Sequence, residues 1–105
     1  MALRKWAYIY LSPGFDPERN RTTTSSATCE FTAIGLDFAD KARVVEISER
    51  LVADGVQMIE LCGGFGPIWI AKVSEAIDSA VPVGGVAYGP EARRPMLDLL
   101  ADEKT

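Results

Sequence analysis

The sequence predicts a single small α/β domain, built on a four-stranded and mostly parallel sheet with three helices. Three observations support this fold: segments of alternating apolar residues, segments with apolar residues at helical spacing, and the order in which the two kinds follow one another. The expected order is strand, strand, helix, strand, helix, strand, helix. Strands that are joined by helices are parallel, with right-handed crossovers. We therefore expect a half-barrel or an open sandwich that spans residues 1–105.

The first two strands are predicted over Lys5–Leu11 and Cys29–Leu36. In the first strand, three aromatic residues alternate with aliphatic ones, a pattern typical of a strand. Between the two strands lies 12–28, which is rich in Pro, Gly, Arg, Thr and Ser and is long for a loop in a compact domain. Such a loop is either a lid over a site or a solvated connection across one sheet edge. The sequence leaves both alternatives open.

The remaining elements follow from changes in hydrophobic period and from residues that begin or end helices. Asp37 is expected to cap a helix that Gly55 ends, and Pro67 suits the first position of the second helix. Pro95 is expected to divide the last helical segment. Because the last three strands are strongly apolar, we expect them to be covered on both faces. In chain order, these elements are a helix over 37–55, a strand over 56–62, a helix over 67–80, a strand over 83–88, a helical segment from 89 onward and a flexible tail over 102–105.

Composition excludes several classes of function. A net charge of −4 argues against broad nucleic-acid binding, which needs a basic surface. No apolar run approaches the roughly 18 residues that a membrane span needs, and the first residues lead directly into a strand, unlike a signal peptide. Two distant cysteines, Cys29 and Cys62, fit reduced thiols in the cytoplasm. Because the chain has no histidine, we expect no metal site, and we expect no cofactor.

The stretch from Ile59 to Pro67 is the most informative for function. Glu60 and Cys62 are two residues apart, so on a strand their side chains share one face. Three glycines follow, which permit a sharp turn and the close approach of a ligand to the main chain. These are Gly63, Gly64 and Gly66. The amides of the turn, together with a helix that starts at Pro67, are expected to bind a carboxylate, carbonyl or phosphate oxygen. A tight structural turn explains the glycines about as well.

Glu60 is the stronger candidate for a catalytic group. A carboxylate buried among apolar residues has a raised pKa, which suits a general base. The structural alternative is a carboxylate paired with Lys5, Arg21 or a tyrosine hydroxyl. Cys62 lies near a helix start that favours the thiolate, whereas a charged Glu60 on the same face opposes it. The candidate ligand-binding residues besides the glycines are Phe65, Tyr8, Tyr10, Tyr88 and Arg21.

Four features of the chain together point to a family. They are the aromatic first strand, Asp-Pro-Glu at 16–18, Glu-Leu-Cys-Gly-Gly-Phe-Gly-Pro at 60–67 and Val-Pro-Val-Gly at 81–84. In these features the chain resembles a small bacterial family of α/β proteins of about this length and of unknown function, with a Glu-Leu-Cys-Gly-x-Phe-Gly-Pro motif. The resemblance implies a shared fold and a shared pocket but brings no activity. The same string is also similar to strand ends that line the mouths of β/α barrels, an analogy of fold alone.

Two functions of different class follow from these observations. In the first, the protein binds a small molecule at the carboxyl ends of its strands, as a cofactor-independent lyase, isomerase or hydrolase with Glu60 as its base. In the second, it is a non-catalytic binding or accessory subunit with a structural glycine turn. In both cases we expect a homodimer, because a thin sheet exposes apolar surface, with the first strand or Trp69 in the contact.

Overall fold

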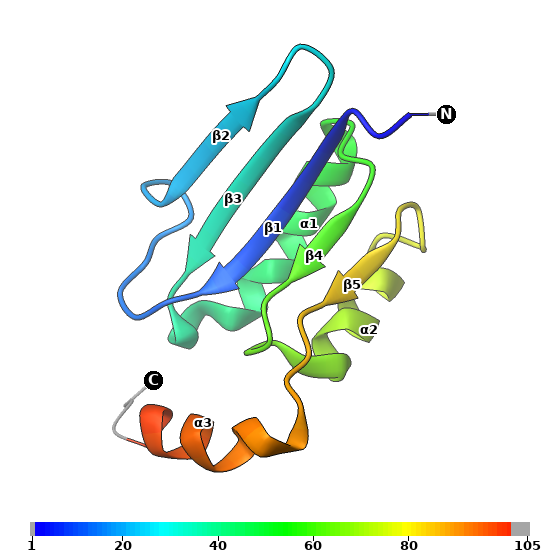
Figure 1. Cartoon of the computed structure of the whole chain (residues 1–105). Coiled ribbons are helices and arrows are strands. Elements are labelled where there is room, and N and C mark those ends of the chain that lie inside the picture. Colours follow the sequence, from blue (N-terminus) through cyan, green and yellow to red (C-terminus); the bar gives the residue numbers. More distant parts are fainter. Residues whose placement is uncertain (1, 102–105) are drawn as a thin grey trace.

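Five strands form one sheet in the computed structural model, which describes residues 2–101 (Figure 1). The order across the sheet is β2-β3-β1-β4-β5. The central strand β1 pairs in parallel with β3 on one side and with β4 on the other, and β5 runs parallel to β4. The expectation of a mostly parallel sheet is therefore confirmed. The strands are β1 (Lys5–Leu11), β2 (Arg21–Ser25), β3 (Glu30–Leu36), β4 (Ile59–Leu61) and β5 (Val83–Gly85).

The prediction of four strands is wrong, because β2 lies within the segment that we expected to be a loop. β2 pairs antiparallel with β3 and forms one edge of the sheet. Its five residues, Arg-Thr-Thr-Thr-Ser, are all exposed. The strand therefore has no buried face to produce an apolar alternation, and the preference of threonine for strands is the only local signal that it carries. Residues 21–25 of the predicted loop are therefore part of the sheet edge.

Three α-helices follow the sequence signals, but the helix predicted over 37–55 is α-helical only from Val44, and the helix predicted over 67–80 ends at Ala76. A 3-10 segment, η1 (Phe38–Arg43), leads into α1 (Val44–Ala53). The Asp37 carboxylate accepts a hydrogen bond from the Ala39 amide, as expected of a cap, and Gly55 takes a positive φ of 92° after the helix. α2 (Gly66–Ala76) has its proline in the first turn. A second 3-10 segment, η2 (Pro90–Ala92), precedes α3 (Arg93–Leu100).

Three expected boundaries need correction. β4 and β5 are shorter than the predicted strands over 56–62 and 83–88, because β4 pairs with only three residues of β1 and β5 with the same three of β4. Pro95 does not divide the last helix, since it lies in the first turn of α3, where a proline nitrogen costs no helical hydrogen bond. The predicted tail over 102–105 lies outside the described residues.

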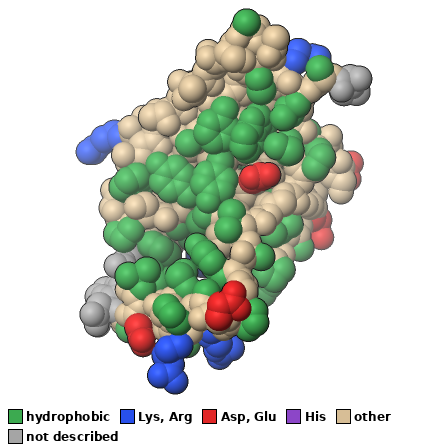
Figure 2. Space-filling view, viewed as in Figure 1, with side chains coloured by type: hydrophobic (Ala, Val, Ile, Leu, Met, Phe, Trp, Pro, Cys, Tyr) green, Lys and Arg blue, Asp and Glu red, His purple; other side chains and the backbone are tan. Residues whose placement is uncertain are grey.

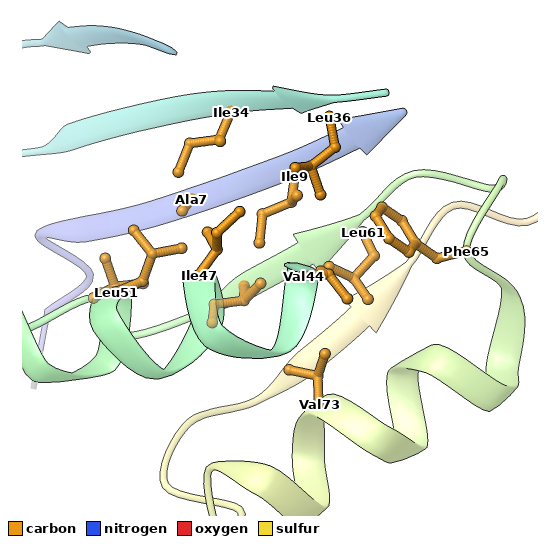
Figure 3. Close-up of a cluster of buried hydrophobic side chains, with 12 residues drawn as sticks. Ala7, Ile9, Ile34, Leu36, Val44, Ile47, Leu51, Leu61, Phe65 and Val73 are labelled. Atoms are coloured by element: carbon orange, nitrogen blue, oxygen red, sulfur yellow. The ribbon is translucent and has the colours of Figure 1, made fainter. Parts of the chain in front are cut away.

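Both long helices cover the same face of the sheet. α1 and α2 lie behind the strands in Figure 1, and their apolar residues meet those of β1, β3 and β4 in one buried cluster (Figure 3). Ile9, Ile34 and Val73 are fully buried in this core. The expectation that helices would cover both faces is wrong. On the opposite face, which we call the open face, no described helix packs over the strands, and α3 lies beyond the strand ends (Figure 1).

Candidate functional site

Glu60 lies on the open face, near the middle of the sheet. Its neighbours along β4, Ile59 and Leu61, are buried on the helix side, so strand alternation directs Glu60 to the other side. In register, Glu60 pairs with Tyr8 of β1 on one side and with Gly84 of β5 on the other. A Cβ atom at Gly84 would have no neighbour within 4 Å, so the carboxylate borders open space there. Glu60 is thus half-buried rather than enclosed in the core, which corrects the expectation of a buried carboxylate.

No ion pair with Glu60 is present among residues 2–101. The two basic residues that we considered as structural partners, Lys5 and Arg21, do not pair with Glu60. Lys5 donates to the Asp54 carbonyl at 2.8 Å and lies 3.9 Å from Glu30. Arg21 pairs in register with the buried Ile34 and therefore lies on the helix side of the sheet. It lines a separate cavity of about 310 Å³, beside α1. The structure therefore does not bring Arg21 together with the other candidate residues.

Cys62 follows β4 directly and lies between two strand ends. Its sulfur accepts a hydrogen bond from the Leu11 amide at 3.3 Å, and its own amide donates to the Ile9 carbonyl at 3.0 Å. The side chain is half-buried and packs against the core. Cys29 is far from it in the sheet, at the start of β3, and both cysteines are free thiols.

The glycine turn has the sharp shape that its sequence predicts. Phe65 donates its amide to the Cys62 carbonyl at 3.1 Å, and Gly66 takes a positive φ of 75° as α2 begins. The Phe65 side chain is only 4% exposed and lies in the core cluster, so its ring does not face a ligand at the turn (Figure 3). At Gly63, a Cβ atom would lie 2.7 Å from the Tyr88 ring. The close packing of Tyr88 on the turn therefore requires glycine at this position.

The three candidate tyrosines lie on or beside the open face. Tyr8 and Tyr10 stack at 6.0 Å between ring centroids, and Phe15 meets Tyr10 edge-on at 5.8 Å. Tyr88 follows β5 and is 58% exposed. Partial burial raises the pKa of the Tyr8 hydroxyl, and the neighbouring groups of Cys62, Tyr88 and Glu60 raise it further. Tyr8 therefore remains a neutral hydrogen-bond donor at pH 7, within electrostatic reach of the other candidate residues.

A cavity of about 710 Å³ lies between the glycine turn and α3. Its walls are mostly apolar, and Arg93 is the charged residue among them. The lining residues are Gly63, Gly64, Tyr88, Gly89, Pro90, Ala92, Arg93, Met96, Leu97, Leu100 and Ala101. The sequence indicated the glycine and tyrosine side of this cavity but not the α3 side. The available signal was the run of apolar residues in α3, which we expected to pack and which leaves Leu97 58% exposed.

Residues 2–101 contain neither a cluster of metal ligands nor a membrane-spanning helix. Within residues 2–101, no three Cys, Asp or Glu side chains come together in a way that could hold a metal ion. None of the helices in the same range combines the length and apolar character that crossing a bilayer requires. What the geometry offers is a carboxylate, tyrosine hydroxyls and a thiol on or beside the open face, and a glycine turn that lines an apolar cavity.

Comparison with known proteins gives one result. A family model described as a family of unknown function (DUF6506) matches residues 4–101. The chain belongs to this family. The DUF6506 match runs from just before β1 to the end of α3, so it includes the open face, the glycine turn and the cavity. Neither a search of curated proteins nor a search of solved structures gave a match.

Proposed function

We propose that this protein binds a small molecule with an apolar body and a polar end at the carboxyl ends of β1 and β4. The observation that carries the proposal is the position of Glu60, the one charged residue among the open-face positions of the five described strands. It lies in register beside Tyr8, and Tyr8 is within electrostatic reach of Tyr88, which lines the apolar cavity. Apolar pockets with a few convergent polar groups are the usual form of ligand sites.

The roles of the groups follow from their chemistry. The apolar residues of α3 and the Tyr88 ring hold the body of the ligand. Its polar end is bound by the Tyr8 hydroxyl, which the raised pKa keeps protonated, and by the amides of the turn. Glu60 then acts as the general base in a proton transfer, or in cleavage of a carbon–oxygen or carbon–nitrogen bond, without a cofactor. Cys62 is within electrostatic reach of Tyr8, and its sulfur, held by the Leu11 amide, helps to position the ligand.

The contacts of Cys62 and Gly63 support a second candidate function. The Cys62 sulfur is a hydrogen-bond acceptor for the backbone of β1, and Gly63 is packed by Tyr88. These contacts support a non-catalytic binding subunit in which the turn serves the fold alone. The thiol distinguishes the two. Slow alkylation of Cys62 until the chain unfolds, with unchanged stability in Cys62→Ser, supports the second function, whereas rapid labelling at neutral pH supports the first.

The proposal extends to the signature motif of the family and to the cellular compartment in which the protein acts. The string Glu60–Pro67 contains the turn, and its Gly63 and Gly64 line the cavity, which supports it as the signature motif of the family. We place the family in bacteria on the same resemblance. The free thiols at Cys29 and Cys62 support a reducing compartment, and with it the cytoplasm, as the place of action.

A thermal-shift screen with a metabolite library tests the proposal, with Glu60→Gln as the variant and Glu49→Gln as its matched control. Glu49 is exposed on α1, away from the open face. A ligand at about 100 times its Kd stabilises the folded chain by about 2.7 kcal/mol, which is readily measured as a rise in Tm. We expect this rise in the natural chain and in Glu49→Gln, and its loss in Glu60→Gln. An equal rise in all three proteins would contradict the proposed site.

The α3 wall of the cavity has a separate test. Leu97 lines the cavity, whereas Leu99, two residues further along the helix, is 71% exposed and does not. A lysine at position 97 places a charged group in the apolar space, so Leu97→Lys should abolish the ligand-induced rise in Tm. Leu99→Lys should keep it. Mass spectrometry of each hit after incubation with the protein then shows whether the bound molecule is also converted.

A further inference from the structure

The open face is a contiguous and mostly apolar surface that no described helix covers. Its strand positions hold aromatic residues, small residues and threonines, with Glu60 as the one charge among them. Trp6 and Phe31 are in contact on neighbouring strands, at 4.4 Å between ring centroids. Figure 2 shows the result, a broad band of hydrophobic side chains across the strands around one acidic group. Contiguous apolar surface of this kind is rare on monomers and marks an interaction site.

The exposed area of the chain is above the average for a compact monomer of its mass. A compact protein of 11.4 kDa exposes about 5,800 Å² of surface. This chain exposes 6765 Å², an excess of about 1,000 Å² over that value. A typical stable protein interface buries about 800 Å² on each partner. α3, in which no residue is buried, contributes to this excess, and the excess is comparable with the area that one subunit buries in a typical interface.

We infer that a second copy of this chain covers the open face, so that two sheets pack face to face in a homodimer. The charge of the surface favours this occupant over a nucleic acid or a charged peptide, because the face is close to neutral. A two-fold interface uses the same patch on both subunits, so each patch must be complementary to itself. A nearly neutral aromatic face meets this requirement, and two sheets that pack in this way lie about 10 Å apart.

The dimer has a consequence for the ligand site. Glu60 and Tyr8 are half-buried in the single subunit and would be enclosed between the two sheets. Exclusion of water strengthens the hydrogen bonds and the electrostatic interactions within a site. The partner subunit would thus close the pocket that one chain leaves open. The inference of a dimer does not rest on the proposed function, because it is argued from the apolar face and the exposed area and not from ligand binding.

Sedimentation velocity of the full chain without ligand tests the inference, with a matched pair of apolar-to-lysine variants. Phe31→Lys places a charge on the open face, at the end of the sheet away from the glycine turn. Ile68→Lys makes the same change on α2, at a side chain that is 68% exposed and next to Trp69. We expect a dimer, about twice 11.4 kDa, for the natural chain and for Ile68→Lys, and a monomer for Phe31→Lys.

A second open-face variant guards against a folding defect in Phe31→Lys. At Gly84 an added side chain meets no atom within 4 Å of its Cβ, so Gly84→Lys should fold normally and still be monomeric. Three results would overturn the inference: a natural chain that is monomeric at micromolar concentration, a monomer that sediments with phosphatidylcholine vesicles, or dissociation by Ile68→Lys but not by the open-face variants. None of these results depends on the Glu60→Gln ligand screen, so the dimer and the ligand site are tested independently of each other.

Discussion

The two faces of the sheet differ in both composition and environment. The helix side is made of aliphatic side chains such as Ile9, Ile34 and Ile59, all fully buried within the single subunit. The open face, built from alternate positions of the same strands, holds Trp6 and Tyr8, which remain half-exposed. In β1, the odd positions 7 and 9 are buried in the core, and the even positions lie on the open face. Substitutions on the two faces should therefore separate stability from association and binding.

The largest expected difference is between neighbouring residues of β1. Ile9→Ala removes buried aliphatic atoms and leaves a cavity in the core, so we expect a loss of about 2–5 kcal/mol in the free energy of unfolding. Tyr8→Ala, one position earlier, removes a half-exposed ring and should cost clearly less. Urea denaturation at a protein concentration that favours single subunits measures both values. Equal losses would show that the open face contributes as much to folding as the core does.

The packing within the open face can be tested at Gly35. A Cβ atom at this position would lie 2.5 Å from the Phe15 ring and 3.0 Å from the Tyr10 ring. Gly35→Ala must displace these rings, and we expect it to cost about 1–3 kcal/mol. Gly84→Ala on the same face meets no such contact and provides the control. Urea unfolding in the Phe31→Lys background compares the two without the effect of association, and an equal response would contradict the described packing.

Asp37 joins the two sides of the molecule at the strand ends. Its carboxylate accepts hydrogen bonds from Gly14, next to Phe15 of the open face, at 2.6 Å, and from Ala39 of η1 at 3.1 Å. These bonds lower the pKa of Asp37. A group with a lowered pKa in the folded state stabilises the fold above its unfolded pKa, and this contribution is lost as the pH falls through the folded value.

The Asp37→Asn variant tests this contribution, because the amide keeps an acceptor oxygen but does not titrate. We expect its Tm to be a few degrees lower than that of the natural chain at pH 7. The gap should shrink as the pH falls below about 4 and disappear near pH 2. Thermal unfolding followed by circular dichroism across this range measures the gap. A gap that stays constant down to pH 2 would show that the charge of Asp37 has no part in it.

The smallest expected effect concerns the ionisation of Tyr8. Burial is the main cause of its raised pKa, followed by the charges of Cys62, Tyr88 and Glu60. Cys62 makes the largest contribution after burial. Cys62→Ser removes it, so the pKa of Tyr8 should fall toward 10.0 without reaching it. NMR titration of ring-labelled tyrosine, assigned with Tyr8→Phe, gives the value. An unchanged pKa would place the thiol outside the electrostatic reach of Tyr8.

The sequence predicted the layers of the fold wherever one side of an element is buried. The alternation in β1, the cap at Asp37 and the helix ends at Gly55 and Pro67 are local signals, and each was confirmed. β2 was missed because an edge strand with no buried residue has no apolar period.

Which residues share a face depends on the strand order, which the sequence does not show. Glu60 is beside Tyr8 because β4 pairs with β1, the first strand of the chain. It does not pair with β3, the strand that precedes it in the sequence. Arg21 was misplaced for the same reason, since the pairing of β2 with β3 directs it to the helix side. The α3 wall of the cavity was missed because the position of a helix beyond the strand ends follows from no local pattern.

The central claim is that the open face is the working surface of the protein and is covered by a second subunit. The two tryptophans report on it, because Trp6 lies on the open face and Trp69 lies on α2 against the core. In Trp69→Phe, acrylamide quenching of the remaining tryptophan measures the exposure of Trp6 alone. We predict weak quenching at high protein concentration, and strong quenching on dilution or in the additional presence of Gly84→Lys. Strong quenching of Trp6 at every concentration would contradict the claim.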